Sequence, residues 1–115
     1  MNVRIKRIYE KPGKNDGTRI LVDRLWSRGL TKEKAKVDLW LNEIAPSNEL
    51  RKWFGHESEK WSEFQKRYRT ELRKNNERLS LLRKAATKEP ITLLFAAKDE
   101  EHNEARVLQN LLIST

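Results

Sequence analysis

Apolar positions recur along the chain with two different periods, and the shorter period marks the strands. Segment 3–9 alternates apolar and charged residues, 19–26 contains the continuous apolar run ILV, and 91–97 reads ITLLFAA. Alternation is typical of a half-buried strand, and a short continuous run is typical of a strand buried on both faces. We therefore expect a strand in each of these three segments.

The longer, 3.6-residue period predicts amphipathic helices. The clearest covers about 58–75, and its apolar stripe consists of Trp61, Phe64, Tyr68 and Leu72. Further helices are expected over 77–87 and at the C-terminal end, where the apolar positions are Ala105, Leu108 and Leu112. Two short helices have start signals, a possible cap at Thr31 and the pair Pro46-Ser47, with Gly55 just after the end of the second.

Segment 37–44, VDLWLNEI, fits both periods. Alternation of its apolar positions favours a strand, and a helix remains the alternative. The loop between the first two strands is too short for a crossover helix, so these strands should pair antiparallel if they are neighbours. Strands this apolar need cover on both faces. The prediction is an α/β fold, a small single domain over 1–115, with a mixed sheet of three or four strands covered by about five helices.

Composition limits the cellular locations and the kinds of site that we expect. No apolar run approaches the roughly 20 residues of a membrane span, and the first ten residues, MNVRIKRIYE, do not resemble a signal peptide. A cytoplasmic protein without a membrane partner is the expectation. The absence of cysteine excludes disulfides, thiolate metal sites and a cysteine nucleophile.

The formal net charge of +8 raises the question of nucleic acid. Basic residues gather between 66 and 84, but Glu63 and Glu71 are interleaved with them and the aromatic rings belong to the apolar stripe. A weak, non-specific nucleic-acid surface over 66–84 remains one alternative function. A protein-interaction adaptor is another, which an exposed apolar patch would support.

Ligands of layered α/β folds bind beyond the carboxyl ends of the strands, and this rule selects two loops. In the first, DRLWSRG, the charged residues Asp23, Arg24 and Arg28 flank Trp26 along the chain. The planar fork of a guanidinium suits a carboxylate or a phosphate. The alternative is that Asp23 and Arg24 form internal salt bridges, which leaves Arg28 as the better ligand-binding candidate.

The second loop, AKDEEHN, carries Asp99, Glu100 and Glu101 onto the predicted start of the last helix. These acids would satisfy the helix dipole and repel an anion, so a ligand here would bring a cationic or hydrogen-bonding group. His102 would lie in the first helical turn as a neutral imidazole, oriented by Asp99 or Glu101 for acid-base work, or it is a structural histidine. His56 is expected to cap the helix before it, and no metal-ligand spacing is present.

Three stretches, LVDRLWSRGLTKEKA, LWLNEIAPSNELRKWFGH and TLLFAAKDEEHNEARVL, resemble the YeaO-like family, part of domain of unknown function 488. The resemblance covers nearly the whole chain and implies a small bacterial cytoplasmic α/β protein without an established reaction. The matching motif positions are Asp23, Arg24, Trp26, Arg28, Gly29, Trp53, Phe54, Gly55, His56, Lys98, Asp99, His102 and Asn103. Ser27 departs from the family, which usually has proline there, and cysteines of the wider family are absent.

Together these observations predict a polar pocket at the strand ends. Arg24 and Arg28 would bind the anionic group of a small molecule or nucleotide, and Asp99 with His102 would form a hydrogen-bonding or acid-base pair. The pocket walls would be the side chains of Trp26 and Trp53. The remaining ligand-binding candidates are Asp23, His56, Lys98 and Asn103. Whether the protein turns its ligand over stays open, and no cofactor, metal or oligomeric state is predicted.

Overall fold

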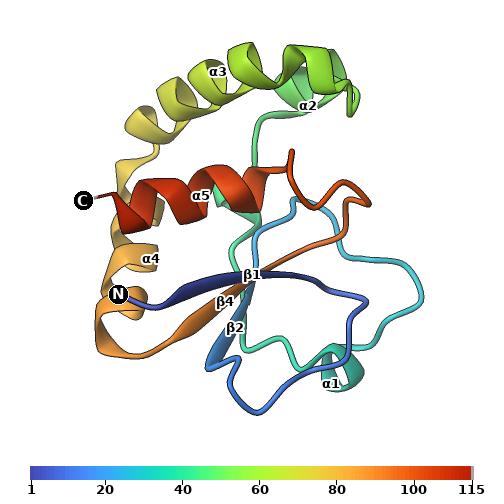
Figure 1. Ribbon diagram of the computed structural model, residues 1–115, viewed down its shortest axis with the longest axis vertical. Helices are drawn as coiled ribbons and strands as arrows, with labels where there is room; N and C mark the ends of the chain where they lie inside the picture. Colours follow the sequence, from blue (N-terminus) through green and yellow to red (C-terminus); the bar gives the residue numbers. More distant parts are fainter. Residues whose placement is uncertain (115) are drawn as a thin grey trace.

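The computed structural model describes residues 1–114, within which a four-stranded sheet lies between helical layers (Figure 1). The strand order is β1-β4-β2-β3, and every pair is parallel. The strands are β1 (Val3–Arg7), β2 (Thr18–Leu21), β3 (Leu39–Trp40) and β4 (Ile91–Phe95). The α/β class and the number of strands agree with the prediction from the sequence.

The sheet is parallel throughout rather than mixed, and the first two strands do not meet the condition for antiparallel pairing, because they are not neighbours. β4 lies between β1 and β2 and pairs in parallel with both. The loop over 8–17 carries the chain from the carboxyl end of β1 back to the level of the amino ends of the strands without a helix, as Figure 1 shows in dark blue. The first two strands are therefore not neighbours, and the length of the loop between them does not determine their direction.

The helices follow the predicted positions closely. They are α1 (Lys32–Ala35), α2 (Asn48–Phe54), α3 (Trp61–Lys74), α4 (Asn76–Lys88) and α5 (Glu104–Ile113), with 3-10 turns η1 (Asn42–Ile44) and η2 (Ser58–Lys60). The side chains of Thr31 and Ser47 cap α1 and α2, and Gly55 ends α2 in the left-handed conformation. Within segment 37–44 the predicted strand is confirmed only over Leu39–Trp40, and the 3-10 turn η1 follows it.

The main core lies between one face of the sheet and helices α2 to α5. The predicted stripe of α3 is buried there: Phe64 stacks on Phe54 with ring centroids 4.4 Å apart. The hydroxyl of the fully buried Tyr68 donates to the carbonyl of Ile44 at 2.7 Å. A smaller cluster covers the other face, beside α1. β2 and β4 are thereby covered on both faces, as their continuous apolar sequences predict.

A buried ion pair joins α1 to the start of β2. Arg19 is only 3% exposed and contacts Asp16 at 2.6 Å, and its guanidinium also donates to the carbonyl of Ala35. Burial alone would raise the pKa of Asp16, but hydrogen bonds from Gly13, Lys6 and Arg19 outweigh it and lower that pKa. Asp16 is therefore held in its ionised form, and its negative charge balances the buried charge of Arg19.

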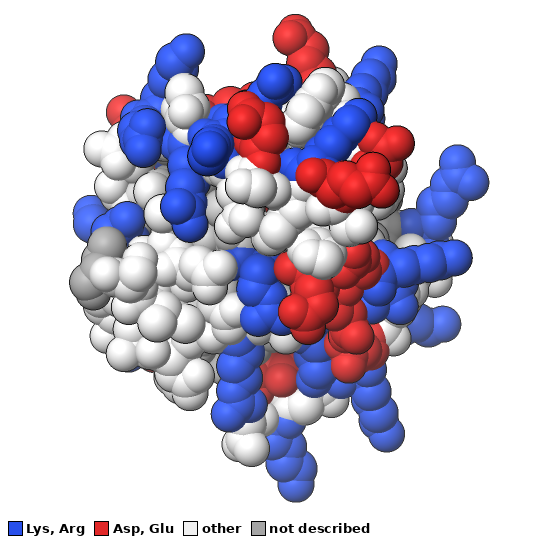
Figure 2. All heavy atoms as spheres, turned by 45° about the horizontal axis from the view of Figure 1, so that its top comes forward, with Lys and Arg blue, Asp and Glu red and all other residues white. Residues whose placement is uncertain are grey.

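The charged surface does not form one basic patch. Figure 2 shows acidic and basic side chains intermingled over much of the face that carries α3. Arg67 pairs with Glu63, and Arg78 pairs with Glu43. The nucleic-acid alternative over 66–84 remains a prediction that this mixture does not favour.

Two further surface features bear on possible partners. At the sheet edge, β3 leaves Leu39 and Trp40 exposed, so the adaptor alternative also remains a prediction. In the part of the chain that the structure describes, no helix combines the length and apolar character that a membrane crossing requires.

Candidate functional site

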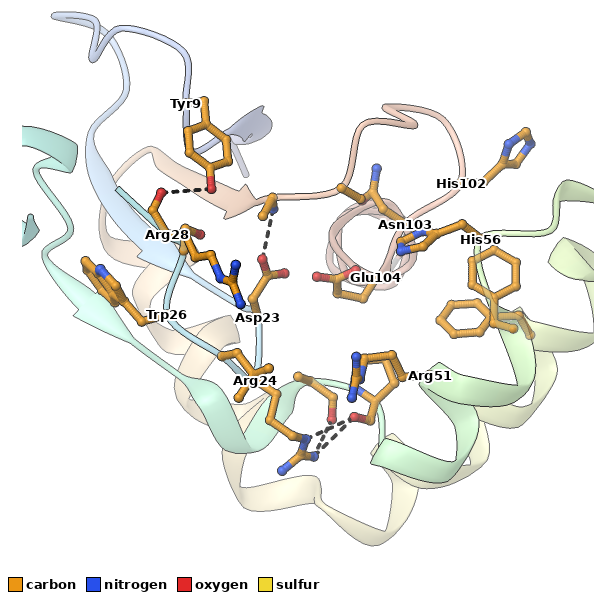
Figure 3. Close-up of a pocket in the computed structure, with 18 residues that line it drawn as sticks. Tyr9, Asp23, Arg24, Trp26, Arg28, Arg51, His56, His102, Asn103 and Glu104 are labelled. Atoms are coloured by element: carbon orange, nitrogen blue, oxygen red, sulfur yellow. Dashed lines mark hydrogen bonds between the residues drawn. The ribbon is translucent and has the colours of Figure 1, made fainter. Parts of the chain in front are cut away.

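A cavity of about 350 Å³ lies beyond the carboxyl ends of β2 and β4 (Figure 3). Because parallel strands end at the same edge of a sheet, the loops that follow β2 and β4 meet there, and the C-terminal end of α2 closes the third side. The predicted site residues that line the cavity are Asp23, Arg24, Trp26, Arg28, His56, His102 and Asn103. Residues far apart in the sequence are thus brought to one place, where the strand-end rule puts them.

Two carboxyl groups face each other in this cavity, those of Asp23 and Glu104 (Figure 3). Asp23 follows β2 directly and accepts the backbone N–H of Ala96 at 2.8 Å. Glu104 is the first residue of α5, placed there by its N-cap Asn103, whose side chain accepts from the N–H of Arg106. Burial and the hydrogen bond with Asp23 raise the pKa of Glu104 well above its usual range. Glu104 is therefore the member of the pair that holds a proton most readily.

The three arginines of the cavity differ in what they already bind. Arg24 donates to the carbonyls of Ala45 and Pro46 at 3.1–3.2 Å and so holds the chain just before α2. The predicted internal salt bridge between Asp23 and Arg24 does not form among residues 1–114. Arg28 and Arg51 point into the cavity in Figure 3.

The guanidiniums of Arg28 and Arg51 are nearly free. For Arg51 the structure gives one hydrogen bond, a long one of 3.5 Å to Asn48, and for the side chain of Arg28 it gives none within the described range. These two arginines, rather than Arg24, have donors to offer a ligand.

The position of His102 differs from the prediction. Asn103 is the N-cap, so His102 precedes the helix instead of lying in its first turn, and the acids at 99–101 also belong to the loop. The Nδ1 of His102 lies 2.9 Å from the Asp99 carboxylate. Its ring packs against Trp61 in a T-shaped arrangement, with ring centroids 5.1 Å apart. Hydrogen bonds from His102 and Glu101 lower the pKa of Asp99. In Figure 3 the His102 ring points away from the cavity centre, although the residue lines its rim.

His56 does not cap α2 as expected. The cap is Gly55, whose N–H donates to the carbonyl of Arg51, and His56 follows with a positive φ of 59°. A left-handed backbone is uncommon for a non-glycine residue. It turns the imidazole of His56 into the cavity, beside Asn103 (Figure 3).

Two predicted ligand-binding residues lie outside the cavity lining. Trp53 packs beneath Arg67 and Lys60, whose cationic groups lie 4.1 and 5.1 Å from its ring. Lys98 is exposed and does not line the cavity. Trp26 does line it, held by a hydrogen bond from its indole N–H to the carbonyl of Leu30 at 2.8 Å. Its ring packs with the smaller cluster beside α1 and against Trp40, and in Figure 3 it points away from the cavity centre, so neither tryptophan ring forms the expected wall.

Sequence reasoning missed Tyr9, Arg51 and Glu104. Tyr9 donates its hydroxyl to the carbonyl of Arg28, which ties the first loop to β1. Arg51 occurs on a short helix whose exposed face is polar throughout, so nothing in its spacing distinguishes it. Glu104 follows a predicted helix cap, and that position by itself only suggests a favourable contact with the helix dipole.

Glu104→Gln is expected to raise the melting temperature by several degrees at alkaline pH and to change it little in acid. A carboxyl with a raised pKa in the folded state contributes its full stability below its unfolded pKa, and that contribution is lost as the pH rises through the folded pKa. The amide does not titrate and avoids the loss. Thermal unfolding from about pH 4 to about pH 8 measures the difference. Glu101→Gln, at an exposed position of the loop before α5, is the control, and an equal pH trend in both variants would refute the explanation.

The fold and the cavity define an α/β protein with a mixed polar site at the carboxyl edge of a parallel sheet. Residues 2–115 match a family model described as "Inactive DUF488-N3 subclade". The chain is 43% identical over 114 residues to the uncharacterized protein YeaO of Escherichia coli (strain K12), covering 99% of both. It is 39% identical over 110 residues to uncharacterized proteins of Mycobacterium tuberculosis and Mycobacterium bovis, covering 96% of this chain and 92% of theirs. No solved structure matches. The chain belongs to the YeaO-like DUF488 family.

Proposed function

We propose that the protein binds a small anionic molecule, of the size of a nucleotide, in the cavity at the carboxyl edge of the sheet. The observation that carries this proposal is the pair of guanidiniums of Arg28 and Arg51, which come from opposite sides of the cavity and have little bonding to other groups of the protein. A phosphate or carboxylate between them would accept charge-assisted hydrogen bonds from both.

The size and lining of the cavity support the same proposal. Its volume of about 350 Å³ lies within the range of small-molecule sites, roughly 300–1,000 Å³. Its walls combine apolar side chains, such as those of Phe54 and Phe64, with polar groups that can orient a ligand, as is usual for such sites.

We propose binding without turnover. The family model that matches nearly the whole chain carries the word inactive in its description. The imidazole of His102 is engaged by Asp99 and Trp61 at the rim, and an acid-base role for Asp99 and His102 stays a prediction. The residues that we expect to contact the ligand are Asp23, Arg28, Arg51 and His56.

Replacing both Arg28 and Arg51 by alanine is expected to weaken binding of nucleoside monophosphates at least about a hundredfold. Each hydrogen bond to a charged group contributes about 1.5–3 kcal/mol, which corresponds to tenfold or more per arginine. Titration calorimetry of adenosine 5′-monophosphate and inorganic phosphate against the wild type and the variant measures the loss.

The matched control is Arg73→Ala, which removes a charge of the same sign from an exposed position on α3. Arg73→Ala is expected to change the affinity by no more than about twofold, because Arg73 does not line the cavity and salt screens exposed charges. If the wild type binds neither probe, or if the control loses as much affinity as the double variant, the proposed function fails.

A further inference from the structure

The wall of the cavity between the two arginines carries negative groups. In Figure 3 the carboxyls of Asp23 and Glu104 face each other and the open space, with Arg28 on one side and Arg51 on the other. A site for an anion alone has no use for acids there, since they repel a negative group that comes near them. The pair is held in place by α5 and by the N–H of Ala96, so it is a fixed part of the wall.

The pair offers acceptors rather than donors to a ligand. One oxygen of Asp23 is occupied by the N–H of Ala96, and the proton favoured on Glu104 by its burial is directed to Asp23 in their mutual hydrogen bond. The remaining lone pairs of both carboxyls can bind only donor groups. An N–H group is therefore the chemical complement of this wall.

The hydroxyl of Ser27 is a further polar group at the cavity, and it lacks a hydrogen-bond partner among the described residues. Ser27 is 5% exposed and lines the cavity, and its hydroxyl oxygen is buried without a hydrogen-bond partner among residues 1–114. Buried polar groups nearly always have a partner, so the orphaned hydroxyl marks this loop as incompletely hydrogen-bonded within the described residues. This observation is independent of the acids and comes from the same short loop as Arg28.

We propose that the Asp23–Glu104 pair makes the cavity selective for anions that also carry an N–H donor, over otherwise matched anions without one. The inference rests on the proposed function and deepens it by naming the ligand class: amino-bearing phosphates or carboxylates. The arginines hold the negative group, and the acids on the wall between them hold the amino group. A nucleobase with an exocyclic amine and an alkyl ammonium both present this chemistry.

Two matched pairs of ligands test the selectivity by titration calorimetry on the full chain. Adenosine 5′-monophosphate and purine riboside 5′-monophosphate differ only in the amino group on the base, and 2-aminoethyl phosphate and ethyl phosphate differ only in the amine. The wild type is expected to bind the amino member of at least one pair about tenfold or more tightly, as one hydrogen bond to a charged group requires. The pair that shows the preference tells whether the donor is carried on a base or on an alkyl chain.

Variants assign the preference to the carboxyl pair. Asp23→Asn keeps the shape of the side chain and the contact with Ala96, but it replaces one acceptor oxygen by an NH₂ donor. The ratio of affinities for the amino ligand and its matched partner should therefore fall to about one. Glu104→Gln still donates to Asp23 and keeps an acceptor oxygen, so it should retain most of the ratio. Thermal unfolding checks that both variants fold, and should Asp23→Asn not fold, the wild-type ratios alone decide.

The possible failures are distinguishable. Equal affinities within both pairs overturn the selectivity and leave the proposed function standing. A preference that survives Asp23→Asn overturns it as well, because another group would then be the source. Absence of binding by all four ligands and by inorganic phosphate refutes the proposed function, and the inference with it.

Discussion

Gly17→Ala is expected to leave little folded protein. Gly17 has a φ of +66°, and a Cβ there would overlap the carbonyl oxygen of Pro90 and lie 2.7 Å from its carbonyl carbon. Gly17 precedes β2 and Pro90 precedes β4, so the overlap separates the two central strands where Thr18 donates to Pro90. Neither backbone can move without breaking the ladder between them. We expect a loss above about 4 kcal/mol, measured by urea unfolding or by soluble yield and circular dichroism.

Gly29→Ala is the matched control. Gly29 also has a positive φ, +79°, but a Cβ there meets nothing within 4 Å. The cost should be only that of a left-handed backbone for alanine, about 1–2 kcal/mol. Equal losses at Gly17 and Gly29 would show that the backbone conformation, and not the overlap with Pro90, dominates.

Asp16→Ala is expected to cost about 3–5 kcal/mol, because removing one partner of a buried ion pair leaves the other charge unpaired. Arg19 would keep its contact with the carbonyl of Ala35 but lose the carboxylate at 2.6 Å. Urea unfolding at neutral pH measures the difference. Because the pKa of Asp16 is lowered in the folded protein, its contribution is present above its unfolded pKa and is lost as the pH falls through the folded value. The gap between wild type and variant should therefore narrow in strong acid.

An exposed pair supplies the comparison for Asp16. Glu63→Ala breaks the contact of 3.1 Å with Arg67, in which both side chains are about half exposed. Solvent-exposed pairs contribute about 0–1 kcal/mol. A loss as large for Glu63 as for Asp16 would contradict the role assigned to burial.

The sequence predicts the elements of this fold better than their arrangement. The apolar stripe of α3, the cap residues Thr31 and Ser47, and the buried runs of β2 and β4 are local signals, and each lies where it was expected. Strand order is not local. No feature of the first two strands indicates that a segment seventy residues downstream will be inserted between them, and for that reason the antiparallel pairing expected of neighbouring strands does not apply.

Much of the candidate site could be predicted because the strand-end rule needs only the strands. It does not need their order, and it selects the loops that carry Asp23, Arg28 and Asn103 correctly. The misses depend on side-chain direction: Arg51 and Glu104 turn inward, and Trp53 turns to Arg67. Nothing in the spacing of these residues encodes that direction. That the cavity binds a ligand stays a prediction.

The central place of β4 has a consequence for the making of the protein. A ribosome releases the chain from its N-terminus, and until residues 91–95 emerge, β1 has no partner and β2 has only the two residues of β3. The apolar face of the helices then has no sheet to pack on. The sheet therefore cannot form until β4 has emerged, and during that interval the apolar strands are exposed to pairing with other chains.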